Sequence, residues 1–143
     1  MALQELIYTS LAIPNASHEN VEDILAASQR NNTQYEVTGL LLFDGDRYIQ
    51  ILEGSAENID KIYGAIAKDK RHHGVELIHR GEIEGRAFTN WRMAYEALPV
   101  GLLGELAEKM SVYAMEVTGE TLSPDESFGT RLDALFMDAL AAE

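Results

Sequence analysis

The chain has 143 residues, enough for one domain with a real core, and carries a net charge of −13 with no cysteine. The absence of cysteine excludes disulfides, thiolate catalysis and Cys-ligated metals, and the acidic charge argues against nucleic acid as a principal ligand. The sequence has no apolar run of about 18 residues to span a membrane and no recognisable export signal. We therefore expect a cytoplasmic protein without a membrane partner.

Residues 3–11 are rich in β-branched and aromatic side chains, which predicts a first strand. A helix capped by Ser17 follows, and its apolar stripe turns polar in the last turn. That end of the helix is either a surface reaching water or the wall of a pocket that holds a polar group. The stripe includes Ile24 and Ser28, and continues into Asn31 and Asn32.

Residues 38–54 predict a β-hairpin, because Asp44-Gly45 separates two apolar runs. Side chains alternate along a strand, so Gln50 shares a face with Tyr48 and Leu52. A buried glutamine without hydrogen-bond partners would cost about 1–3 kcal/mol. Gln50 therefore either bonds neighbouring backbone or belongs to a functional site.

A second helix begins after Ser55 and ends in the basic cluster 68–73. Strands are expected over residues 75–83 and 91–98. The order β-α-β-β-α-β-β predicts an α+β, ferredoxin-like fold with a five-stranded mixed sheet and two helices on one face. The adjacent residues His72 and His73 diverge and lack a third ligand, so no metal site is expected.

The composition changes at Pro99, which divides the chain into a core, residues 1–98, and a more acidic C-terminal segment, residues 99–143. Amphipathic helices are expected in this segment, because apolar residues recur at helical spacing in 102–113 and again in 124–140. We expect these helices to cover the second face of the sheet.

Strand parity and helical spacing bring a polar set together between the sheet and the first helix. A phenol and amides in an apolar pocket are poor acid–base catalysts at neutral pH, but they suit a planar heteroaromatic ring with a hydrogen-bonding edge. Nothing in the spacing names that ring. The set consists of Tyr8, Asn31, Asn32, Gln50, Trp91 and Met93.

Several motifs resemble the BLUF family, blue-light sensors that use FAD. They are Leu6-Ile7-Tyr8-Thr9-Ser10, Ser28-Gln29-Arg30-Asn31-Asn32, Thr38-Gly39-Leu40-Leu41 through Gln50-Ile51-Leu52-Glu53-Gly54, Asp69-Lys70-Arg71-His72-His73 and Trp91-Arg92-Met93. The short chain is similar to the stand-alone photoreceptors of that family. The resemblance implies a noncovalent flavin sensor that is not an enzyme.

The resemblance also implies roles for single residues. Asn31 and Asn32 would hold the carbonyl and imide edge of the flavin ring, beside Ile24 and Ser28. Gln50 would bridge Tyr8 and the flavin. On the ribityl-phosphate side, the resemblance places Asp69, Arg71 and His72. Gly64-Ala65 stands where many relatives carry a basic residue, which leaves FAD, FMN and riboflavin open.

The mechanism implied by the family is photochemical. Excited flavin would take an electron and a proton from Tyr8 through Gln50. When these recombine, Gln50 would be left rotated or tautomerised. Trp91 and Met93 would relay the change to the C-terminal helices. The output would be binding of an unidentified downstream signalling protein, in a homodimer or higher homo-oligomer.

Three other functions fit parts of the pattern. A flavin-dependent oxidoreductase would need substrate access and a proton donor at the ring. An acylphosphatase-like enzyme would need an arginine in the loop 11–15, which has none. A light-insensitive module, with or without flavin, is distinguished by the colour of the protein and by its response to light.

Overall fold

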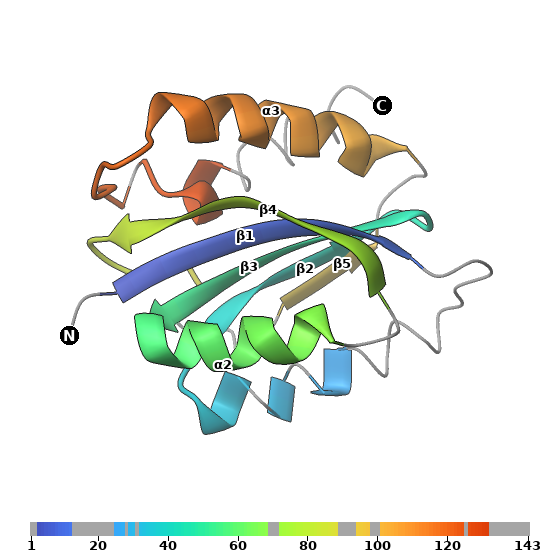
Figure 1. Ribbon diagram of the computed structural model, residues 1–143, viewed down its shortest axis with the longest axis horizontal. Helices are drawn as coiled ribbons and strands as arrows, with labels where there is room; N and C mark the ends of the chain where they lie inside the picture. The colour runs from blue at the N-terminus through green and yellow to red at the C-terminus, as the bar shows by residue number, and fades with distance from the viewer. Residues whose placement is uncertain are drawn as a thin grey trace.

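The computed structural model describes the sheet and the helices on both of its sides (Figure 1). Its elements are β1 (Leu3–Ala12), β2 (Thr38–Phe43), β3 (Arg47–Ser55), α2 (Ala56–Ala67), β4 (His72–Ile83), β5 (Ala94–Ala97) and α3 (Leu102–Glu116). The described residues are 3–12, 25–27, 29–30, 32–68, 72–88, 94–97, 101–124 and 126–131.

The strands lie in the order β4-β1-β3-β2-β5. Four of them, β4, β1, β3 and β2, pair antiparallel, and the short β5 pairs parallel with β2. The predicted α+β class is confirmed. The fifth strand is described only over Ala94–Ala97, within the predicted range 91–98.

The hairpin forms where the sequence predicts it, with Phe43 opposite Tyr48 in the register of β2 and β3. Gly45 takes a positive φ of 96°, which favours glycine. The Asp44 Oδ1 atom accepts hydrogen bonds from the Asp46 and Arg47 amides at 3.0 and 2.9 Å. The side chain of Asp44 therefore closes the turn that its sequence pattern predicts.

The sheet is buried on both faces. Tyr8, Tyr48 and Leu52 belong to the core beside α2, whereas Ile7 and Ile51 belong to the core beside α3. In Figure 1, α2 and α3 lie on opposite sides of the sheet. The alternation expected from the sequence is therefore confirmed, and each face has its own helical cover.

Helix α2 begins at the predicted cap. The Ser55 Oγ atom accepts a hydrogen bond from the Asn58 amide at 3.3 Å, and Ile59 and Ile62 are buried. Arg80 of β4 reaches the start of this helix, where its Nη2 donates to the Ala56 carbonyl at 3.0 Å. The expected first helix falls partly outside the described residues, which show helical stretches at 25–27, 29–30 and 32–34.

Helix α3 covers the second face through the predicted stripe, with Leu103, Leu106 and Met110 buried. Of the predicted segment after residue 124, residues 126–131 are described, and Phe128 is buried in the same core. None of the helices in the described part of the chain is long and apolar enough to cross a membrane.

Candidate functional site

Tyr8 and Gln50 meet in the middle of the sheet. They are direct partners in the antiparallel register of β1 and β3, and both side chains point to the α2 side. The Tyr8 hydroxyl donates a hydrogen bond to the Gln50 Oε1 atom. Tyr8 is 0% exposed and Gln50 is 1% exposed, so this pair is removed from water. The structure thus joins the two residues that the sequence placed on one face.

An apolar wall surrounds the pair on the α2 side. The Tyr63 ring of α2 lies 5.7 Å from the Tyr8 ring, tilted by 53°. Burial raises the pKa of the Tyr63 phenol. Sequence analysis did not identify this contact between Tyr63 and Tyr8. Helical periodicity predicts which face a residue takes, but not its partner on another element.

Asn32 is the third predicted site residue whose surroundings are described. Its side chain is buried, and its backbone carbonyl accepts a hydrogen bond from the Val37 amide at 2.9 Å. This bond fixes the end of the helical stretch 32–34 to the residue that precedes β2. Asn32 is therefore turned into the protein, whereas its described neighbours Gln29, Arg30 and Thr33 are exposed.

The other predicted site residues lie outside the described side chains. His72 begins β4, but its side chain is not among those described. The structure leaves the positions of the remaining predicted residues untested: Ile24, Ser28, Asn31, Asp69, Arg71, Trp91 and Met93.

The described donors and acceptors fit the polar edge of a flavin ring. Tyr8, Gln50 and Asn32 provide one phenol and two amides, all buried. An amide offers both a donor and an acceptor, as a ring edge that carries carbonyl and imide groups requires. The apolar side chains of the same core, Leu6, Leu41 and others, suit the faces of an aromatic ring.

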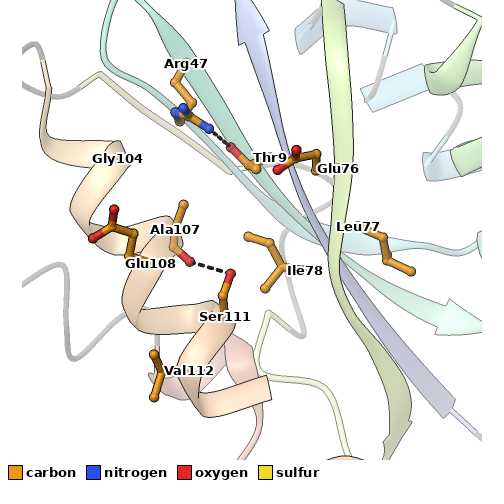
Figure 2. A pocket seen from close by; sticks show the side chains of 10 residues that line it. All are labelled: Thr9, Arg47, Glu76, Leu77, Ile78, Gly104, Ala107, Glu108, Ser111 and Val112. Carbon is orange, nitrogen blue, oxygen red and sulfur yellow. Dashed lines mark hydrogen bonds between the residues drawn. The ribbon is translucent and has the colours of Figure 1, made fainter. Parts of the chain in front are cut away.

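A groove of about 520 Å³ lies on the opposite face, between β4 and α3 (Figure 2). Arg47 there donates to the Thr9 hydroxyl at 3.3 Å, and Ser111 donates to the Ala107 carbonyl at 2.9 Å. Figure 2 shows the Leu77 side chain pointing away from α3. Because Thr9 lies on the other face of β1 from Tyr8, this groove is separate from the Tyr8–Gln50 pair.

Comparison with known proteins agrees with this geometry. The family model "BLUF: Sensors of blue-light using FAD" matches residues 3–94. The chain therefore belongs to the BLUF family, whose members are described as sensors of blue light that use FAD. This confirms the family and the sensor function that the sequence motifs indicated.

One relative is the blue light- and temperature-regulated antirepressor BluF of Escherichia coli, 40% identical over 77 residues. That match covers 53% of this chain and 19% of BluF, so the chain spans about a fifth of the relative's length.

Two solved structures share the fold. A bacterial light-regulated adenylyl cyclase matches with a TM-score of 0.65 and 27% identity, over 80% of this chain and 34% of that chain. The dark-state structure of the BLUF protein BlrB matches with a TM-score of 0.69 and 24% identity, over 94% of this chain and 97% of that one.

Proposed function

We propose that Tyr8, Gln50 and Asn32 are the residues with which this blue-light sensor binds its flavin and responds to light. The observation that carries the proposal is the buried hydrogen bond from the Tyr8 hydroxyl to Gln50 Oε1. A tyrosine is an oxidisable side chain, and here it is already bonded to an amide that can change orientation. A glutamine with a purely structural role would need neither an oxidisable partner nor the freedom to change orientation.

The amide of Gln50 can exchange donor and acceptor. With Oε1 turned toward Tyr8, the NH₂ group of the same amide points away from the Tyr8 oxygen. A half-turn of the amide would present NH₂ to the Tyr8 oxygen and the carbonyl to the ligand. Bound flavin would supply light absorption and, when excited, a strong oxidant for Tyr8. The protein stores the result as a changed hydrogen-bond pattern.

We propose FAD as the flavin, on the family description. Asn31 and Asn32 would hold the ring edge, with Ile24 and Ser28 beside them. Asp69, Arg71 and His72 would lie toward the phosphates. Because Gly64 and Ala65 on α2 offer no cation there, FMN and riboflavin stay as alternatives, and mass spectrometry of the released flavin distinguishes the three.

For the output, we propose that residues 1–98 are the sensor and residues 99–143 the transmitting cover. Trp91 and Met93, just before β5, would relay the change. The protein would form a homodimer or higher homo-oligomer in the cytoplasm. There it would bind a downstream signalling protein. The name of the E. coli relative, an antirepressor, describes such action on another protein in that relative.

The test is the absorption spectrum of flavin-loaded variants before and after blue light. In Tyr8→Phe we expect flavin to stay bound and the normal red-shifted state to disappear, because only the hydroxyl is lost. In Gln50→Leu we expect the same loss, since leucine can neither donate nor accept. The infrared shift of the flavin carbonyl should vanish in both variants.

Tyr35→Phe is the matched control, because Tyr35 also packs against the α2-side core but lies only at its edge. It should keep the full photocycle. A normal red shift in Tyr8→Phe, or a normal carbonyl shift in Gln50→Leu, would contradict the roles proposed here.

A further inference from the structure

Two carboxyl groups are buried on the face of the sheet opposite the Tyr8–Gln50 pair. Glu5 of β1 and Glu53 of β3 are both 0% exposed. They are direct partners in the antiparallel register, three residues along the same strands from Tyr8 and Gln50. Buried acids are rare unless specific groups stabilise them.

Each carboxyl group binds the backbone of a different segment. The Glu5 Oε1 atom accepts from the Phe128 amide at 2.8 Å, and Oε2 accepts from the Gly129 amide at 3.4 Å. Glu53 accepts from the Ala87 and Phe88 amides at 2.8 and 3.0 Å. Glu5 therefore anchors the C-terminal segment 127–131, and Glu53 anchors the loop before β5.

The two anchored segments touch at Gly129. A Cβ atom added there would lie 2.7 Å from the Ala87 Cβ and 3.4 Å from the Glu53 Oε2. Any larger residue would force the segments apart, so the glycine allows the close approach. Phe128 completes the contact by stacking on the His79 ring of β4 at 4.3 Å.

The docked state favours a proton on this pair. Burial raises the pKa of the Glu5 carboxyl from 4.5 to about 7, and the neighbouring Glu53 adds to the rise, while the amides of Phe128 and Gly129 oppose it. Burial also raises the pKa of Glu53. If residues 127–131 leave the sheet, Glu5 meets water and its pKa returns toward 4.5.

The sign of the pH dependence follows from this difference. Between pH 4.5 and 7 the docked form holds a proton that the released form does not hold. The proton therefore adds to the stability of docking at low pH, and this added stability is lost progressively as the pH rises through about 7.

The other charged groups near the pair do not produce the same pH dependence of docking. Burial lowers the pKa of His79, so its contribution falls as the pH falls, opposite to that of Glu5. Arg86 lowers the pKa of Glu53, and donates to the Glu53 and Glu36 carbonyls and the Thr38 hydroxyl. In the C-terminal segment, Glu126 and Arg131 are exposed.

We propose that the Glu5–Glu53 carboxyl pair is a proton-dependent clamp that holds residues 127–131 on the sheet and holds them less firmly when its proton is lost. The clamp lies on the two strands that carry the light-sensing pair. The clamp would make the docking of residues 127–131 depend on pH.

The test is amide hydrogen exchange by NMR on the full-length, flavin-loaded protein in the dark, from pH 5 to 8.5. Exchange is expressed as protection factors, which divide out the effect of pH on the intrinsic exchange rate of each amide. We expect the protection of the Phe128 and Gly129 amides to fall up to about tenfold per pH unit toward pH 7 and then to level off. Glu5→Gln, which stays neutral, should keep high protection throughout.

Glu126→Gln is the matched control, because Glu126 immediately precedes residues 127–131 but is exposed. It should retain the pH dependence of the wild type. Protection that is constant or rises with pH in the wild type would overturn the proposal, as would a wild-type pH dependence in Glu5→Gln. If Glu5→Gln does not fold, the ¹³C titration of the Glu5 carboxyl decides: a midpoint near 7 supports the clamp, and one near 4.5 rejects it.

Discussion

At the scale of single residues, the described candidate site consists of three buried polar side chains, Tyr8, Gln50 and Asn32. Tyr8 and Gln50 are bonded to each other across β1 and β3, which makes them one unit. Asn32 comes from a different part of the chain, the helical stretch that leads into β2. A change at Asn32 should therefore affect binding, whereas a change in the pair should affect the response to light.

We predict that Asn32→Ala weakens flavin binding by about 1–3 kcal/mol, because it removes the buried hydrogen-bonding group that we propose binds the ring edge. Flavin occupancy after purification and the dissociation constant measure this loss. Ser10→Ala is the control, since Ser10 is also buried on the Tyr8 face of β1. Equal flavin occupancy in Asn32→Ala and the wild type would show that Asn31 or the backbone makes that contact.

At the scale of secondary-structure elements, Asp44 connects the hairpin with α3. Its Oδ1 atom closes the turn, and its Oδ2 atom accepts from the Gly101 and Leu103 amides at 3.1 Å. The N-cap of α3 is Gly101, which has no side chain for this purpose. Asp44 thus caps a helix that begins more than fifty residues later, and its negative charge suits the helix N-terminus.

We predict that Asp44→Ala lowers the free energy of unfolding by about 2–4 kcal/mol, because four backbone amides lose their acceptor. Urea denaturation of the flavin-loaded protein measures this loss. Asp46→Ala is the control in the same turn, since Asp46 is exposed, and it should stay within about 0.5 kcal/mol of the wild type. Similar losses in both variants would mean that the turn, and not the cap of α3, sets the effect.

At the scale of the whole molecule, β1 and β3 are the central strands between two helical layers. Gln50 faces the α2 layer, and its chain neighbours Ile49 and Ile51 face the α3 layer. Each strand therefore contacts both layers through alternate residues. Gln50 is therefore one residue along the chain from side chains that belong to the core beside α3.

We predict that blue light changes hydrogen exchange in α3 and leaves the helical stretches 25–27 and 32–34 largely unaltered. The physical reason is that α3 packs on Ile49 and Ile51, the direct neighbours of Gln50. Dark and illuminated samples compared by exchange mass spectrometry test this, with Gln50→Leu as the unresponsive control. Identical exchange across residues 99–143 while the photocycle runs would show that the signal leaves by another surface.

Local patterns in the sequence determined much of this protein. Alternation along residues 3–11 and 47–55 predicted which side chains face each layer, because a strand repeats every two residues. Asp44-Gly45 predicted the hairpin, and Ser55 predicted the start of α2, because turns and caps depend on near neighbours. The motifs around Tyr8, Asn32 and Gln50 indicated the BLUF family.

The contacts that only the tertiary structure decided join residues distant in the chain. Glu5 lies opposite Glu53 and binds Phe128, and Asp44 caps α3, because of strand register and layer packing. No period in the sequence encodes such partners. An acidic residue in a strand is normally expected at the surface. The buried carboxyl pair could therefore be found only from the structure, in which both faces of the sheet are covered.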